Sequence, residues 1–248
     1  MSEHRDVTAA DDPRLLELQE RLAAVRGRIT AATEAAGRRD NPPELIVVTK
    51  FHPADDVRRL AALGVSDVGE NRDQEASDKA ARLSALGLRW HFVGQLQSNK
   101  AKSVVRYAHA IHSVDRPQLA SALARSIATE QERTGRGPLE CFIQVSLDDD
   151  AGSHRGGASR LDVVALADQL AGSPGLVLAG LMAVAPLGSD PDAAFGRLAE
   201  ISAQLLRDHP SASGISAGMS QDLESAVRAG ATHLRIGSDI LGSRPALR

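Results

Sequence analysis

Eight short apolar runs, most of them separated by helical patterns, are the feature of this sequence that most constrains its fold. The runs lie at residues 45–51, 67–71, 89–93, 110–114, 140–147, 177–183, 214–217 and 233–237. Amphipathic spacing between them predicts helices at residues 54–63, 115–130, 161–171, 193–207 and 221–229. Near-continuous apolar strands that alternate with helices are typical of parallel βα units, because helices then cover the sheet.

The number of these units and the length of the chain favour one closed barrel. The chain has 248 residues, and a (β/α)8 barrel of the TIM type commonly takes about 250. An open doubly wound sheet is the alternative. The first run is not followed by Gly-x-Gly-x-x-Gly, and the sequence has no Walker phosphate loop, so a dinucleotide-binding sheet is disfavoured. We therefore predict an α/β protein built as a single (β/α)8 barrel.

An extra helix is expected before the barrel. Residues 13–36 carry apolar side chains at three- and four-residue spacing, namely Leu15, Leu18, Leu22, Val25 and Ile29. Residues 1–12 lack the basic and apolar regions of a secretory signal and are expected to form a disordered lead-in. The predicted organisation is a lead-in at residues 1–12 followed by one barrel domain at residues 13–248.

Composition disfavours several classes of function. The net charge of −3 and the 2% aromatic content argue against nucleic-acid binding. No apolar run approaches the roughly 20 residues of a membrane span. The single cysteine, Cys141, excludes an internal disulfide and fits a reducing compartment, so a cytoplasmic location is expected. His109 and His112 have no carboxylate or thiolate set beside them in the sequence, so no metal site is expected. A monomer is expected, because so few aromatic residues offer no sign of a large apolar surface.

In a barrel of this kind, functional residues lie where the strands end at the carboxyl side. The first run, "IVVTKFHP", brings Lys50 to that position. Burying an ammonium group costs several kcal/mol unless it is paired or neutralised, so a lysine placed there calls for a role. Polar residues that end other runs are Asn71, Gln95, Ser113 and Ser146.

The two loops after the seventh and eighth runs predict a phosphate site. They contain Ser216, Gly218 and Ser220, and then Arg235, Gly237 and Ser238. Small residues and hydroxyls let backbone N–H groups approach an anion, and these two loops form the usual phosphate site of such barrels. Taken alone, Ser216 and Ser220 would more often be helix caps, and Ser220 has that alternative here.

An amine facing a phosphate site suits pyridoxal 5′-phosphate (PLP), bound to Lys50 as an internal aldimine. A lysine-dependent aldolase that acts on a sugar phosphate is another reading of the same residues.

Several motifs resemble the pyridoxal phosphate homeostasis protein family, which is itself similar to the isolated N-terminal barrel of alanine racemase. In chain order they include "VVTKFHP", "GVSDVGENRDQEASDKAARL", "WHFVGQLQSNKAK", "IHSVDRPQLASAL", "GLMAVAP" and "ISAGMSQDLESAVRAGATHLRIGSDILG". The resemblance runs from about residue 45 to residue 242 and implies a fold-type III PLP-binding barrel. By motif, Lys50 resembles the Schiff-base lysine, and Arg235 resembles the arginine that faces the pyridine nitrogen. The resemblance also implies that Ser216, Gly237 and Ser238 hold the phosphate and that Asn71 and Met219 line the pocket.

One loop departs from the family pattern. After the fifth run the family implies Asn-x-x-x-Glu-x-x-Lys-x-Gly, whereas this chain has "SLDDDAGSHRGGA". The lysine is missing, and His154 or Arg155 could supply positive charge instead.

The resemblance implies a protein without catalytic turnover that holds PLP and buffers it or transfers it to apo-enzymes. An arginine only donates hydrogen bonds, so it leaves the pyridine nitrogen unprotonated and makes the ring a weaker electron sink. A racemase also needs a second acid/base, a tyrosine reached through a second domain. Tyr107, the single tyrosine here, is expected to be a packing residue. A low-activity amino-acid racemase is the alternative.

Overall fold

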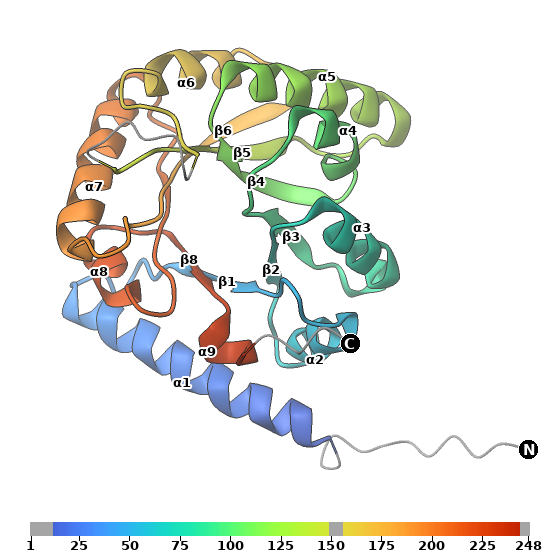
Figure 1. The fold of residues 1–248 in the computed structure, drawn as a ribbon, viewed down its shortest axis with the longest axis vertical. Helices are drawn as coiled ribbons and strands as arrows, with labels where there is room; N and C mark the ends of the chain where they lie inside the picture. The colour runs from blue at the N-terminus through green and yellow to red at the C-terminus, as the bar shows by residue number, and fades with distance from the viewer. Residues whose placement is uncertain (1–11, 149–155, 244–248) are drawn as a thin grey trace, which may run out of the picture.

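The computed structural model describes residues 12–148 and 156–243, and within them eight parallel strands close into a barrel (Figure 1). The strands follow one another around the barrel in chain order, and β1 closes it by pairing with β8, where Ile46 lies opposite Arg235. The predicted barrel is therefore confirmed, and the open sheet is excluded. The strands are β1 (Glu44–Val48), β2 (Asp67–Glu70), β3 (Arg89–Phe92), β4 (Ala108–Val114), β5 (Leu139–Gln144), β6 (Leu176–Met182), β7 (Gly214–Ser216) and β8 (His233–Ile236).

Helices surround the barrel and bury its outer face. Val47 of β1 packs against this layer with Val57 and Leu60, and all three are fully buried. The sequence pattern missed α3, whose buried apolar face consists only of Ala76 and Ala80. The helices that follow strands are α2 (Ala54–Ala62), α3 (Asp73–Arg82), α4 (Ala101–Val104), α5 (Pro117–Thr134), α6 (Val163–Ala171), α7 (Pro191–Asp208), α8 (Leu223–Arg228) and α9 (Ser238–Leu241), with the 3₁₀ turns η2 (Ser84–Leu86) and η3 (Ser98–Lys100).

The extra N-terminal helix is present as α1 (Pro13–Ala35), and it packs against α2, α8 and α9 (Figure 1). The Asp12 side chain caps it by accepting from the N–H groups of Arg14 and Leu15, so this last residue of the predicted lead-in is ordered. Residues 1–11 lie outside the described residues. The bounds of the barrel domain, residues 13–248, therefore stay a prediction. Among residues 12–148 and 156–243, no helix has both the length and the apolar character that crossing a bilayer requires.

Strand β1 is shorter than the sequence predicted. It ends at Val48, because Phe51 has a φ of 68° and this left-handed conformation cannot continue a strand. Lys50 consequently lies in the turn between β1 and α2 rather than within the strand.

The inside of the barrel is unusually polar. Branched apolar residues fill most barrels of this type, but here the buried side chains of His91, His112, Ser216 and Arg235 contact one another inside it. The ring of His112 stacks on Phe142 with 4.4 Å between centroids. A charged and hydrogen-bonding interior therefore connects the two ends of the barrel.

Candidate functional site

The turn that carries Lys50 is held in a strained conformation. Phe51 is the one residue other than glycine with a positive φ in the part of the chain that the structure describes, and such a conformation costs on the order of 1–3 kcal/mol. Its N–H donates to Glu75 Oε1 at 2.6 Å, and the Arg72 guanidinium lies 4.7 Å from the centre of its ring. Strain of this kind persists only where the surroundings enforce it, and it is concentrated at functional sites.

A second lysine, Lys79, lies buried beside this turn. Its Nζ is 2.7 Å from Glu70 Oε1, 2.6 Å from Glu75 Oε1 and 2.8 Å from the carbonyl oxygen of Thr49. Thr49 also donates its hydroxyl to Glu70 Oε1 at 2.6 Å. Burial raises the pKa of Glu70, although Lys79 and Thr49 act in the opposite direction. Lys79 and the carboxylates of Glu70 and Glu75 thus join the ends of β1 and β2 to α3. They fix the backbone next to Lys50 through the carbonyl of Thr49. No role for Lys79 was predicted from the sequence, although its four-residue spacing from Glu75 was a usable signal.

Arg235 of β8 is a buried cation with few partners. It is 5% exposed; its Nη1 donates to Ser216 Oγ at 2.7 Å and its Nη2 to the carbonyl of Ala183 at 2.9 Å. Both of these partners among the described residues are uncharged oxygen atoms. Burial lowers the pKa of Arg235 to about 10, so it stays charged at neutral pH. A guanidinium has five N–H groups, so donors remain for an anion or a ring nitrogen.

The loops after β7 and β8 meet through two hydroxyls, with 3.1 Å between Ser220 Oγ and Ser238 Oγ. Gly218 precedes Ser220 with a φ of +92°, and a Cβ there would lie 2.6 Å from Ala226 Cβ. A Cβ on Gly237 would lie 3.0 Å from the carbonyl oxygen of Val48. Both loops therefore need glycine to come close to the barrel wall and present their hydroxyls together.

Helix α1 supports these two loops from outside. Arg28 donates from Nη2 to the carbonyl of Ser220 at 3.0 Å, and its guanidinium pairs with Asp239 at 2.7 Å and Glu224 at 2.9 Å. The extra N-terminal helix is thus tied to the region where the sequence predicts the phosphate.

The structure places the predicted residues in two groups. Ser216 is fully buried, and its hydroxyl contacts Arg235 and His112 Nδ1, the latter at 2.8 Å. Ser238 is instead exposed beside Ser220, for which a helix cap was the alternative prediction. Met219 is 39% exposed. His154 and Arg155 lie outside the described residues. A direct phosphate contact by Ser216 stays a prediction.

Four buried side-chain atoms in the described residues have no hydrogen-bond partner: His52 Nδ1, Glu70 Oε2, Asn71 Oδ1 and Ser113 Oγ. All belong to the carboxyl ends of β1, β2 and β4 or to the residues just after them. An unpartnered buried polar atom costs about 1–3 kcal/mol, so such atoms indicate a missing ligand or water. A lysine, a buried guanidinium, a hydroxyl pair and unpartnered acceptors fit the aldehyde, ring and phosphate of PLP.

The fold and site together define a parallel barrel of the alanine racemase type with a lysine at the carboxyl end of its first strand. A model of the alanine racemase N-terminal domain matches residues 21–245. The pyridoxal phosphate homeostasis protein of Mycobacterium bovis is 45% identical in an alignment 253 residues long. The alignment covers 96% of this chain and 97% of the relative. PipY of Synechococcus elongatus, solved with PLP bound, has a TM-score of 0.77 and 36% identity and is matched over 91% of this chain and 100% of PipY. The chain belongs to the pyridoxal phosphate homeostasis protein family.

Alanine racemase from Corynebacterium glutamicum shares the fold. It has a TM-score of 0.65 and 18% identity, with 94% of this chain matched to 63% of the racemase. A substantial part of the racemase therefore lies outside the region that matches this chain.

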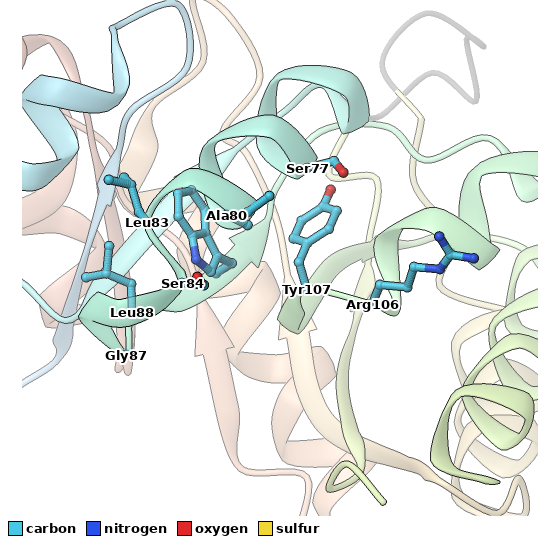
Figure 2. A pocket seen from close by; sticks show the side chains of 10 residues that line it. Ser77, Ala80, Leu83, Ser84, Gly87, Leu88, Arg106 and Tyr107 are labelled. Atoms are coloured by element: carbon cyan, nitrogen blue, oxygen red, sulfur yellow. The ribbon is translucent and has the colours of Figure 1, made fainter. Parts of the chain in front are cut away.

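Tyr107 lies outside the barrel. It lines a surface hollow of about 370 Å³ formed by α3, η2 and the residues that precede β3 and β4, and Figure 2 shows its hydroxyl directed toward α3. The hydroxyl donates to Asp73 Oδ1 at 3.4 Å, and burial raises the pKa of Tyr107. These contacts are those of a packing residue.

Proposed function

We propose that this protein binds PLP covalently through Lys50 and holds it for release to other proteins, without a catalytic turnover of its own. The observation that carries the proposal concerns the neighbouring strands β1 and β8: β1 is followed by the strained turn that contains Lys50, and β8 carries the buried Arg235 guanidinium, whose hydrogen bonds among the described residues go to uncharged oxygens. The names of the relatives and the PLP bound to PipY support the same cofactor.

The residues of the chain divide the work of binding. When bound, the cofactor supplies an aldehyde that condenses with a primary amine and releases water. Lys50 supplies the amine, and Lys79 fixes the turn that carries it through the carbonyl of Thr49. Arg235 provides a donor for the ring nitrogen and keeps that nitrogen unprotonated, which disfavours carbanion chemistry.

For the phosphate we propose Ser220 and Ser238 with the backbone around Gly237. Their hydroxyls are 3.1 Å apart, and a dianion between them would gain charge-assisted hydrogen bonds. Ser216 then acts on Arg235 rather than on the phosphate. Asn71 lines the pocket with its unpartnered Oδ1, and Met219 lies next to Ser220 at its rim.

A low-activity racemase is the alternative function, and the position of Tyr107 is an argument against it. Racemisation needs an acid/base on the second face of the cofactor, and the Tyr107 hydroxyl bonds to Asp73 of α3. The two functions separate in heavy water: single enantiomers of amino acids would exchange their α-proton and invert with a racemase, and we expect neither. Apo-enzymes as recipients, a monomeric state and a cytoplasmic location belong to the same proposal.

Lys50→Ala tests the proposal directly. We expect wild-type protein incubated with PLP to gain a visible absorption band, borohydride to trap the cofactor on Lys50, and the variant to lack both. Lys102→Ala is the matched control, because Lys102 is an exposed lysine outside the site. A band that survives in Lys50→Ala, or a wild-type protein that stays colourless with PLP, would contradict the proposal.

A further inference from the structure

We infer that a hydrogen-bonded chain of four buried side chains, Asp67, His91, His112 and Ser216, positions the Arg235 guanidinium from the opposite end of the barrel. We call these four hydrogen-bonded residues the axial chain. Its own existence does not depend on PLP, and only its effect on the cofactor rests on the proposed function.

The axial chain is continuous in the structure. Asp67 Oδ1 lies 2.9 Å from His91 Nε2, and His91 Nδ1 lies 3.0 Å from His112 Nε2. His112 Nδ1 lies 2.8 Å from Ser216 Oγ, which accepts from Arg235 Nη1 at 2.7 Å. None of these residues is more than 5% exposed. Asp67 is the first residue of β2 and Ser216 the last of β7, so the chain runs from the amino-terminal to the carboxyl-terminal end of the strands.

The direction of every hydrogen bond follows from Asp67 once His91 is neutral. An ionised carboxylate only accepts, so a neutral His91 donates from Nε2 and accepts at Nδ1. His112 then donates from Nε2 and accepts at Nδ1. The hydroxyl proton of Ser216 goes to His112, which leaves the Ser216 oxygen to accept from Arg235. Every donor and acceptor of the axial chain, the Ser216 hydroxyl proton included, has a partner only if both imidazoles are neutral, because an imidazolium at His91 would make His112 accept at Nε2 and donate from Nδ1.

The surroundings favour an ionised Asp67 and a neutral His112. Arg89 lies 2.7 Å from Asp67 Oδ1, and hydrogen bonds from His91 and Arg89 hold the pKa of Asp67 well below its usual range although burial opposes this. Burial, together with nearby His91, Arg235, His233 and His109, lowers the pKa of His112 well below its ordinary value. A fixed negative charge at one end and a neutral ring in the middle give the chain its polarity.

The direction of these hydrogen bonds matters for Arg235. Among the described residues its guanidinium donates to only two acceptors, Ser216 Oγ and the carbonyl of Ala183. If His112 adopted the other tautomer, its Nδ1 would donate to Ser216, and the serine oxygen would have to accept from two donors. The Ser216 proton would then have no partner in the chain, and the Arg235 anchor would weaken. A carboxylate that sets the tautomer of a histidine acts in the same way in serine proteases.

The experiment uses the cofactor-free protein first. Nitrogen-15 NMR of the wild-type protein near neutral pH should show His91 and His112 as neutral Nε2–H tautomers, and separate, slowly exchanging Nη signals for Arg235. His112 found as the Nδ1–H tautomer or as an imidazolium overturns the inference, whether or not PLP binds.

His91→Phe then tests the coupling, with His209→Phe as the matched control, because His209 lies at the end of α7, where its Nε2 is 3.0 Å from Asp168, and takes no part in the axial chain. His91→Phe should switch His112 to the Nδ1–H tautomer, merge the Arg235 Nη signals, shift the PLP absorption band and weaken PLP binding by about 3- to 10-fold, which corresponds to one lost hydrogen bond. His209→Phe should change none of these.

Two outcomes separate the proposals. An unchanged Arg235 spectrum in a folded His91→Phe protein overturns the positioning role. Absence of PLP binding by a wild-type protein with the expected tautomers overturns the proposed function and leaves the axial chain standing.

Discussion

The two ends of the barrel carry similar polar residues, but these residues are paired at the amino-terminal end and only partly paired at the carboxyl end. At the amino-terminal end Arg89 pairs with Asp67 at 2.7 Å and with Glu44 at 3.2 Å. At the carboxyl end, all four of the unpartnered buried atoms in the described residues occur at or just after strand ends, together with the left-handed Phe51. Because a structural polar group is normally satisfied, the comparison teaches that incomplete satisfaction, and not polarity, distinguishes the carboxyl end, where we propose the PLP site.

The amino-terminal end also has a hollow, of about 330 Å³, lined by Arg89, His91, His109 and His233 among others. Its carboxylates have partners: Glu44 lies beside Arg89 and Glu140 lies 3.6 Å from His109. We interpret this end as the structural anchor of the axial chain.

Lys79→Met should have the largest effect, because it leaves Glu70 and Glu75 next to each other without their cation. Removing one partner of a buried ion pair destabilises by about 3–5 kcal/mol, and urea unfolding measures the loss. Lys100→Met is the control, since Lys100 is 47% exposed on its side chain and 3.7 Å from Asp73, and it should change stability by less than about 1 kcal/mol. Equal losses of unfolding free energy in the two variants would mean that Lys79 is no more important to stability than an exposed lysine.

Gly218→Ala should come next. The new Cβ would collide with Ala226 and Leu234 at 2.6 and 2.7 Å in a backbone with a φ of +92°, so we expect a loss of about 2–4 kcal/mol. Gly196→Ala within α7 is the opposite case, because nothing lies within 4 Å of a Cβ there. It should stabilise the protein by about 0.5–1 kcal/mol. Thermal unfolding of both variants decides whether the close approach at Gly218 is real.

Acid should weaken the amino-terminal end through His233. Burial lowers the pKa of His233 from 6.5 to about 4, so between these values the unfolded chain binds a proton that the folded chain does not. The free energy of unfolding should therefore fall as the pH drops from about 6.5 to about 4, by about 2–3 kcal/mol from this residue. His233→Gln should flatten that part of the stability profile measured by urea unfolding. An unchanged slope would mean that His233 is not buried as the structure has it.

Ser220→Ala combined with Ser238→Ala should have the smallest effect and should act on the cofactor alone. Loss of two charge-assisted hydrogen bonds should weaken PLP retention by about 1–3 kcal/mol, with little change in unfolding, because neither side chain is buried. Ser216→Ala should instead disturb the absorption band more than retention. Dialysis of the loaded proteins followed by absorption spectra compares them, and the reverse pattern would return the phosphate to Ser216.

The fold was largely predictable because its signals are local. Apolar runs and amphipathic spacing identified all eight strands and α1, and strand direction placed Lys50 and Arg235 toward the carboxyl end of the barrel. The end of β1 was wrong by three residues because the left-handed Phe51 is held by Glu75, which lies 24 residues away. Local apolarity carries no information about such a contact.

The candidate site was predictable only in part, for the same reason. Lys79 looks like a surface helix residue in the sequence, and only its contact with Glu70 and Thr49 reveals a buried cation. Ser216 and Ser220 look alike in the sequence, yet the first faces His112 across 104 residues and the second faces Ser238.

The sequence by itself determined that this chain forms a barrel and that a lysine and an arginine lie toward the carboxyl ends of its first and last strands, since both follow from the alternation of strands and helices. The tertiary structure alone decided which polar groups satisfy one another and which do not. Hydrogen bonds depend on distances of about 3 Å between residues that closure of the barrel brings together, and the order of residues along a chain does not specify these.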